Sequence, residues 1–443
     1  MFVIKKQAHE NINLLTSLLI TEQMFSSQAA ELTRLYIWFY TSSKLKYCRS
    51  LNAKIVTYHP FLFQTMYSLF KRLYVLFVLL CIVNTVDAQK FSTVFEQSQG
   101  KQTATYQELI AYYKTLSATY PTLQLQEVGA TDTHYPLHIV YYSQDQNFSI
   151  RSWKEEQRII LLINNGIHPG EPDGIDASMQ LLRDAAQGKL HIPKQIVLAV
   201  VPVFNIGGML NRGSYSRANQ NGPQSYGFRG NAQNLDLNRD FIKMDAQETK
   251  SLVSLMRALD PDIFIDNHVS NGADYQHVMT LLSPNNQKLG KHMGAFLNEV
   301  MEPELYQEMK LAGYDLAPYV NHWGDTPDKG WTQFYDPPRF TSGYAALFQT
   351  FAFVPEAHML KPYAQRVAAT YALMKTFINL AATHQQAIKQ VRQKERNYVL
   401  AQKDVPLNWV VDTTKFTTIS FKGYKAKYKP SEVSGKLRLY YDR

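Results

Sequence analysis

The chain has 443 residues, of which 45% are hydrophobic and 19% are charged, and its formal net charge is +9. This balance is typical of a globular protein with one large domain and room for a small second one. No block of basic residues is interleaved with aromatic ones, so a nucleic-acid-binding surface is not expected.

Residues 66–88 have the pattern of a secretory signal peptide, with a short basic stretch, the apolar run 73–83 and small residues before a cleavage point. The run is shorter than the roughly 20 apolar residues of a membrane helix, so we expect no stable membrane span after cleavage. Because a signal belongs at the start of a protein, we expect translation to begin at Met66. Residues 1–65 would then be a mis-extended reading frame; a genuine extension with a signal anchor is the alternative.

Both cysteines, Cys48 and Cys81, precede the predicted cleavage point. The mature chain would therefore have no thiol nucleophile, no cysteine metal ligand and no disulfide. Export without disulfides favours a secreted or periplasmic bacterial protein.

Helical and extended patterns alternate along the mature chain. Apolar residues at helical spacing predict helices, and short alternating or continuous apolar runs predict strands. The predicted helices are 105–120, 173–187, 245–259, 285–301 and 362–391, and the predicted strands are 123–128, 136–142, 158–163, 195–201, 262–266 and 277–282. This alternation indicates an α/β fold with a mixed, mostly parallel sheet and helices on both faces.

Two segments depart from the alternation. Residues 205–235 are rich in Gly, Asn, Ser and Arg without a period, and a long loop of this kind inside a compact domain is usually functional. Residues 401–443 alternate like β structure and predict the start of a small β-rich region. The pattern breaks off inside a strand-like stretch, so we expect the natural protein to continue.

Polar residues with metal-ligating side chains follow two of the predicted strands. His168 and Glu171, in the stretch NNGIHPGEPDG, lie on the turn between a buried strand and a helix, and His268 directly follows the strand 262–266. In open α/β sheets, ligands bind at the carboxyl ends of the strands. A catalytic zinc takes three protein ligands from His and Glu or Asp and keeps a fourth position open. We therefore predict that these three residues bind one zinc ion per chain.

A further motif lies between the two groups of ligands, in residues 234–241 (NLDLNRDF). With it the chain resembles the zinc metallocarboxypeptidases, the carboxypeptidase A-like peptidases, whose pattern is HxxE, DxNR, a His and a late Glu. The matching residues are His168 and Glu171, then Asp236, Asn238 and Arg239, then His268, then Glu356 in FVPEAH. The likeness covers residues 105–385 and implies a carboxypeptidase-like catalytic domain over residues 89–400.

The resemblance implies roles for the matched side chains. Glu356 would be the general base that takes a proton from a metal-activated water. Asn238 and Arg239 would hold the free C-terminal carboxylate of a peptide, because a guanidinium binds a carboxylate through two parallel hydrogen bonds. Asp236 is expected to accept a hydrogen bond from the far nitrogen of His168 and so orient its ring.

Two further roles are assigned by resemblance to residues outside these motifs. An arginine would stabilise the oxyanion, and Arg229 is chosen over Arg212 and Arg217 because it lies nearest the DxNR motif. A mobile tyrosine would cap the substrate, and Tyr344 is chosen over Tyr335 because a glycine precedes it.

The sequence favours an exported zinc carboxypeptidase that acts on peptides with a free C-terminal carboxylate, including cell-wall peptides. One alternative is a zinc amidase or deacylase on the same scaffold, acting on N-acyl amino acids or cell-wall peptides. Asn238 and Arg239 suit both, since both substrates carry a carboxylate. The other alternative is a catalytically silent binding protein, against which the retention of all the motifs argues.

Overall fold

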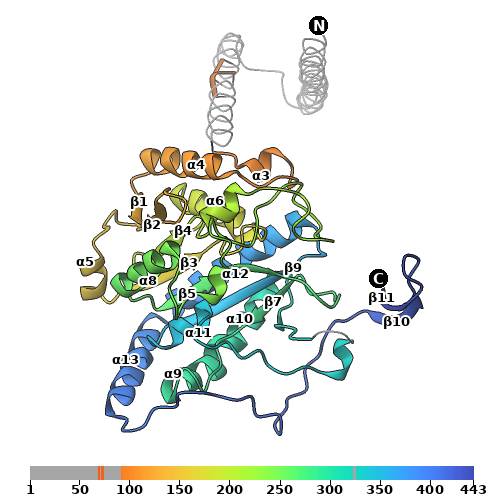
Figure 1. Cartoon of the computed structure of the whole chain (residues 1–443). Helices are drawn as coiled ribbons and strands as arrows, with labels where there is room; N and C mark the ends of the chain where they lie inside the picture. The colour runs from red at the N-terminus through yellow and green to blue at the C-terminus, as the bar shows by residue number, and fades with distance from the viewer. Residues whose placement is uncertain (1–67, 70, 74–90, 323–325) are drawn as a thin grey trace, which may run out of the picture. The chain divides into compact units, whose positions relative to one another are not determined.

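The computed structural model describes residues 68–69, 71–73, 91–322 and 326–443 (Figure 1). The predicted signal peptide, 66–88, lies outside this part of the chain apart from the short helical stretch at 68–69 and 71–73, and so does the segment 1–65. That helical stretch belongs to one compact unit, Met1–Val86, and all elements described below belong to the other, Asp87–Arg443. Within the described ranges, no helix is both long and apolar enough to cross a membrane.

The six predicted strands are present in the predicted order, together with further strands. They are β1 (Leu123–Gly129), β2 (Leu137–Tyr142), β3 (Ile159–Asn164), β4 (Ile196–Val201), β5 (Ile263–Asp266), β6 (His268–Ser270), β7 (Met279–Leu282), β8 (Ala317–Pro318), β9 (Phe351–His358), β10 (Lys425–Pro430) and β11 (Leu437–Asp442).

The helices alternate with these strands. The α-helices are α3 (Val94–Gln97), α4 (Tyr106–Thr119), α5 (Ile150–Glu155), α6 (Asp173–Ala186), α7 (Ile206–Leu210), α8 (Gln247–Leu259), α9 (Lys291–Phe296), α10 (Glu302–Leu311), α11 (Thr341–Ala346), α12 (Tyr363–Thr383) and α13 (Gln385–Ala401). Two 3₁₀ turns, η1 (Leu237–Arg239) and η3 (Pro327–Lys329), and a π-helical turn, η2 (Leu297–Met301), complete the set.

Nine strands form one sheet in the order β1-β2-β4-β3-β5-β9-β7-β8, with β6 paired to β9. The pairs β3–β4, β3–β5, β5–β9, β6–β9 and β7–β8 are parallel, and β1–β2, β2–β4 and β7–β9 are antiparallel. The predicted mixed, mostly parallel sheet is confirmed. Because β3, β5 and β9 run parallel as neighbours, their carboxyl ends meet at one edge of the sheet.

Alternate side chains of the strands enter two separate cores. In β3, Ile159, Leu161 and Ile163 pack in a cluster with α4, α6, α12 and the α9–α10 region. Ile160 and Leu162 pack in a second cluster with α5, α8 and α11. Helices therefore cover both faces of the sheet, as predicted.

Two predicted helices differ from the observed ones. The helix expected over 285–301 begins only at α9, because Gly290 has a left-handed backbone with φ of 87°, and it continues through η2 and α10 to Leu311. The helix expected over 362–391 is two helices, α12 and α13, which meet at His384. In the region 401–443, β10 and β11 pair as an antiparallel hairpin.

The buried carboxyl of Asp176 makes the stability of this fold depend on pH. Asp176 lies in α6, is fully buried, and accepts a hydrogen bond from the Tyr363 hydroxyl. Burial nevertheless raises the pKa of Asp176 to about 7. An unfolded aspartate titrates near ~3.9, so the protonated form is favoured by folding. Its contribution to stability is fully present below about pH 4 and is lost as the pH rises through about 7.

We therefore predict that Asp176→Asn flattens the pH dependence of unfolding. The wild-type free energy of unfolding should fall relative to the variant by up to about 1.4 kcal/mol per pH unit between roughly pH 4 and 7. Urea unfolding of both proteins at a series of pH values measures this difference. Parallel curves for the two proteins across that window would show that Asp176 ionises normally in the folded chain.

Candidate functional site

His168, Glu171 and His268 converge on one point at the carboxyl edge of the sheet. Each offers a ligand atom, and these atoms all lie within 4.8 Å of one another. His168 Nδ1 lies 3.3 Å from Glu171 Oε1, and His268 Nδ1 lies 3.1 Å from Glu171 Oε2. All three residues are buried. Two segments about a hundred residues apart in the chain thus form one group that could bind a metal ion.

The register of the parallel strands produces this convergence. Asn164, the last residue of β3, pairs with Asp266, the last residue of β5, and its side-chain amide donates to the Asp266 carboxylate at 2.9 Å. The β3–α6 turn that follows carries His168 and Glu171, and β6 begins with His268 directly beyond β5.

A carboxylate behind each imidazole fixes the orientation of the ring. His168 Nε2 lies 3.0 Å from Asp236 Oδ1, as predicted, and His268 Nε2 lies 3.1 Å from Asp266 Oδ2. A proton shared with the carboxylate at Nε2 leaves Nδ1 free to act as a ligand. Asp266 was not predicted as a partner, although its place two residues before His268 was visible in the sequence.

The charges around the ligand group favour a bound cation. Burial opposes the charged form of His268, but the carboxylates of Asp266 and Glu171 outweigh this effect and raise the pKa of the imidazole well above its usual value. Burial also opposes ionisation of Glu171, but Arg217 and His168 hold the pKa of its carboxyl well below the usual range. Two imidazoles, each oriented by a carboxylate at its Nε2 atom, and one ligand carboxylate match the ligand chemistry of a catalytic zinc site.

Glu356 is placed beside the ligand group by strand pairing. It lies in β9, where its Cα is the register partner of His268 in β6. Burial raises the pKa of Glu356 to about 8; His268 opposes this rise and the Glu171 carboxylate adds to it. A carboxyl group with a raised pKa in a cavity is suited to proton transfer near neutral pH.

The three arginines considered from sequence have different surroundings. Arg212 donates to the carbonyls of Thr103, Ala104 and Ser225 and is structural. Arg217 Nη1 lies 2.6 Å from Glu171 Oε1, and its Nη2 and Nε donate to Val269 O and Gln220. Arg229 is half exposed, pairs with Asp236 at 2.9 Å, and places Nη1 3.3 Å from His168 Nδ1. Arg229 therefore combines closeness to the ligands with access to solvent.

A cavity of about 320 Å³ opens onto these groups. Besides the three ligand residues, its lining includes Arg217, Arg229, Asn238, Arg239, Tyr319, Phe334, Phe340 and Glu356. Within the described residues, the buried Asn238 Oδ1 has no hydrogen-bond partner. Arg239 stacks 4.3 Å over the Phe340 ring, and the burial of its guanidinium lowers its pKa. Arg239 lines the cavity as a cation and is suited to bind an anionic group, whereas the unpaired Asn238 oxygen is an acceptor suited to a donor.

The choice of Tyr344 as the capping residue is not supported by its position. Its side chain is buried in α11, with its ring 5.7 Å from Phe241 and 5.2 Å from Phe348, and it does not line the cavity. Tyr319 lines the cavity instead. The sequence did not show that Tyr344 is a core residue, because α11 was not predicted and its apolar face was therefore not recognised.

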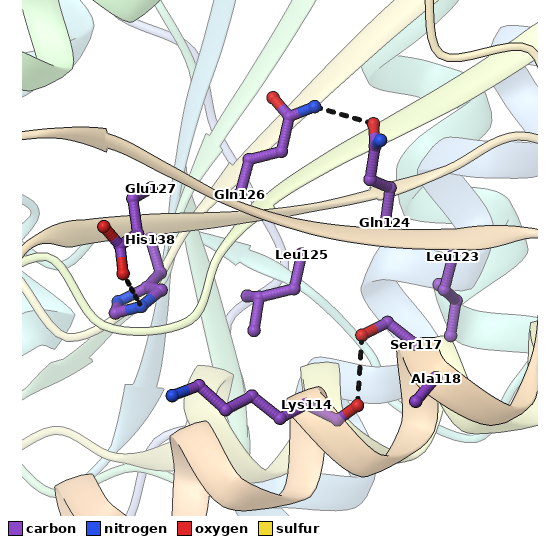
Figure 2. A pocket seen from close by; sticks show the side chains of 9 residues that line it. All are labelled: Lys114, Ser117, Ala118, Leu123, Gln124, Leu125, Gln126, Glu127 and His138. Atoms are coloured by element: carbon purple, nitrogen blue, oxygen red, sulfur yellow. Dashed lines mark hydrogen bonds and ion pairs between the residues drawn. The ribbon is translucent and has the colours of Figure 1, made fainter.

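A second hollow, of about 420 Å³, lies between α4 and the edge strand β1, as Figure 2 shows. Its polar lining includes Lys114, Glu127 and His138, and Gln126 donates to Gln124 at 2.7 Å on the strand. It shares no lining residue with the cavity at the ligand group, so the larger hollow is not the candidate metal site.

No family model and no curated protein matches the chain. Among solved structures, it is similar to a metallo-carboxypeptidase from Burkholderia cenocepacia, with 15% identity, coverage of 63% of this chain and 69% of the other, and a TM-score of 0.44. It is also similar to the carboxypeptidase A from Helicoverpa armigera, with 13% identity, 64% and 74% coverage, and a TM-score of 0.48. Both of those proteins are carboxypeptidases. At such low identity and TM-score, the likeness concerns the fold alone.

Gly174, in the first turn of α6, is a steric constraint on the site. A Cβ at this position would lie 2.5 Å from Asn267 Cβ and 2.4 Å from Asn165 Oδ1, and Asn267 directly precedes His268. Alanine favours a helix over glycine by about 1 kcal/mol, but overpacking typically costs about 1–3 kcal/mol.

We predict that Gly174→Ala destabilises the protein and weakens zinc binding, because the clash displaces the segment that carries His268. Chemical unfolding and competition with a chelator measure the two effects. Gly188→Ala, just beyond the other end of α6, is the control for zinc binding, since its added Cβ would meet no atom within 4 Å, although its φ of 71° makes alanine strained there. A Gly174→Ala protein as stable as the wild type, with unchanged zinc affinity, would contradict this reading.

Proposed function

We propose that the protein is an exported zinc-dependent carboxypeptidase that hydrolyses the C-terminal peptide bond of its substrates. The observation that carries this proposal is the convergence of His168, Glu171 and His268 within 4.8 Å, with Glu356 paired in register to His268. A zinc ion held there supplies Lewis-acid chemistry, which polarises a carbonyl and acidifies water. Export is inferred from the signal-like sequence of residues 66–88.

We assign the proton transfers to Glu356. Its carboxylate lines the same cavity as the ligand group, so it can accept a proton from the attacking water and return it to the leaving amine. We assign stabilisation of the oxyanion to Arg229. Both arginines have protein partners, but the Arg229 side chain is 47% exposed at the cavity, whereas that of Arg217 is only 16% exposed.

The carboxylate-binding end of the cavity is assigned to Asn238 and Arg239. Both lie in η1, and Asp236 directly precedes this turn. One short segment therefore carries the residue that orients His168 and the two residues that would hold the substrate. This coupling fixes the distance between the substrate's terminal carboxylate and the hydrolytic centre. Such a fixed distance is what limits cleavage to the last peptide bond.

We predict that Glu356→Gln keeps the zinc but loses turnover. The amide is nearly isosteric with the carboxyl but cannot accept the water proton, so kcat should fall by about 10² to 10⁴-fold. Metal analysis and peptide hydrolysis are measured on the same preparation. His168→Ala serves as the contrast, because it should lose the metal as well. Turnover near the wild-type rate in Glu356→Gln would remove Glu356 as the base.

We also predict that Arg239→Ala impairs cleavage of peptides with a free carboxylate. Loss of hydrogen bonds to a charged group costs roughly 1.5–3 kcal/mol, so kcat/KM should fall by about 10- to 100-fold. Arg339→Ala is the matched control, since Arg339 stacks on the same Phe340 ring but does not line the cavity. Equal cleavage of amidated and free peptides by the wild-type protein would exclude a carboxypeptidase.

A further inference from the structure

Residues 421–424, which we call the strap, lie against the segment that leads into β7. The backbone N–H of Gln276 donates to the Lys422 carbonyl at 2.8 Å, and the backbone N–H of Lys422 donates to His277 Nε2 at 3.1 Å. Tyr275 and Gly423 form an antiparallel bridge. The strap is thus held by backbone hydrogen bonds as well as by side chains.

The His277 ring fits the strap only in its neutral form. Its Nδ1 donates to the carbonyl of Asp315 at 2.9 Å, so its Nε2 must be the acceptor for the Lys422 N–H. Burial lowers the pKa of His277, which maintains this neutral state. The Lys422 ammonium pairs with the Asp315 carboxylate on the same side.

Phe421 inserts its ring into an aromatic cluster beneath the strap. Its centroid lies 5.1 Å from His277, 5.5 Å from Tyr275 and 5.1 Å from Trp331. The contacts are tilted or edge-to-face, the geometry favoured by aromatic pairs, so they stabilise the strap beyond the burial of the ring.

Tyr275 connects this cluster to both strands that carry the proposed active site. It is only 1% exposed, its ring lies 4.3 Å from His358, and its hydroxyl lies 3.3 Å from Ser270 Oγ. Ser270 is two residues beyond His268 in β6, and His358 is two residues beyond Glu356 in β9. Residues two apart in a strand share a face. Tyr275 therefore packs against the face of β6 and β9 that carries His268 and Glu356.

We propose that Phe421 and Tyr275 are positioning residues of the site: the strap presses Tyr275 against β6 and β9 and so fixes His268 relative to Glu356. The expected effect on catalysis rests on the proposed function, whereas the expected effect on the position of β6 does not. β6 has only three residues and continues an interrupted strand, so its position depends on such outside contacts. A misplacement of roughly 1 Å in an active site can reduce the rate by about 100-fold.

The test compares Phe421→Ala with Phe416→Ala in the full, zinc-loaded chain. Phe416 is 88% exposed, five residues earlier in the same segment, and serves as the matched control. Hydrogen exchange of the amides of residues 268–270 is measured together with zinc affinity, kcat and KM. In Phe421→Ala, exchange in β6 should be about tenfold faster or more, while β2 and α8 stay protected.

In the same variant, zinc affinity and kcat should fall, with little change in KM, and Phe421→Tyr should restore all of them because the ring is retained. Equal exchange of β6 in the two alanine variants would overturn the proposal. Faster exchange with an unchanged kcat in an active enzyme would overturn the positioning role. If the wild-type protein cleaves no peptide, the proposed function fails, and faster exchange in Phe421→Ala alone still supports the strap.

Discussion

The parallel pairing of β3 with β5 is the constraint on which the site depends. It sets Asn164 opposite Asp266 at the ends of the two strands, and a hydrogen bond between their side chains locks that register. A shift of β5 by one residue would move each of its side chains to the opposite face of the sheet and carry His268 away from the β3–α6 turn. The same Asp266 carboxylate then holds His268, so one residue couples strand register to ring orientation.

The site balances buried charges that would be costly alone. Carboxylates from Glu171, Asp236 and Asp266 face two imidazoles, and Arg217 and Arg229 lie against them from the loop that precedes η1. Each of these carboxylates lies within hydrogen-bonding distance of an imidazole or a guanidinium, which lowers the cost of keeping ionised groups away from water. The long loop over 205–235 therefore has a structural role, because it brings the two guanidinium groups to the carboxylates of Glu171 and Asp236.

The architecture could be predicted from the sequence where apolar periodicity was strong. Continuous apolar runs such as 158–163 and 195–201 predicted buried parallel strands, and the placement of His168, Glu171 and His268 after such strands predicted their convergence. Short elements were missed because their patterns compete with local backbone effects: Gly343 lies inside α11, and Gly290 delays the start of α9. Without α11, Tyr344 could not be recognised as a core residue. The partners of Arg217 and the contacts of Phe421 could not be predicted either, since both depend on segments that meet only in the folded chain.

The most direct test of the account is the coordination of zinc in the loaded protein. Crystallography with anomalous scattering at the zinc edge locates the ion and its ligands. We predict one zinc per chain, bound by the Nδ1 atoms of His168 and His268 at about 2.0–2.1 Å and by the Glu171 carboxylate at about 2.0–2.2 Å. A protein that holds no zinc, or one whose zinc lies away from these three side chains, would contradict the account.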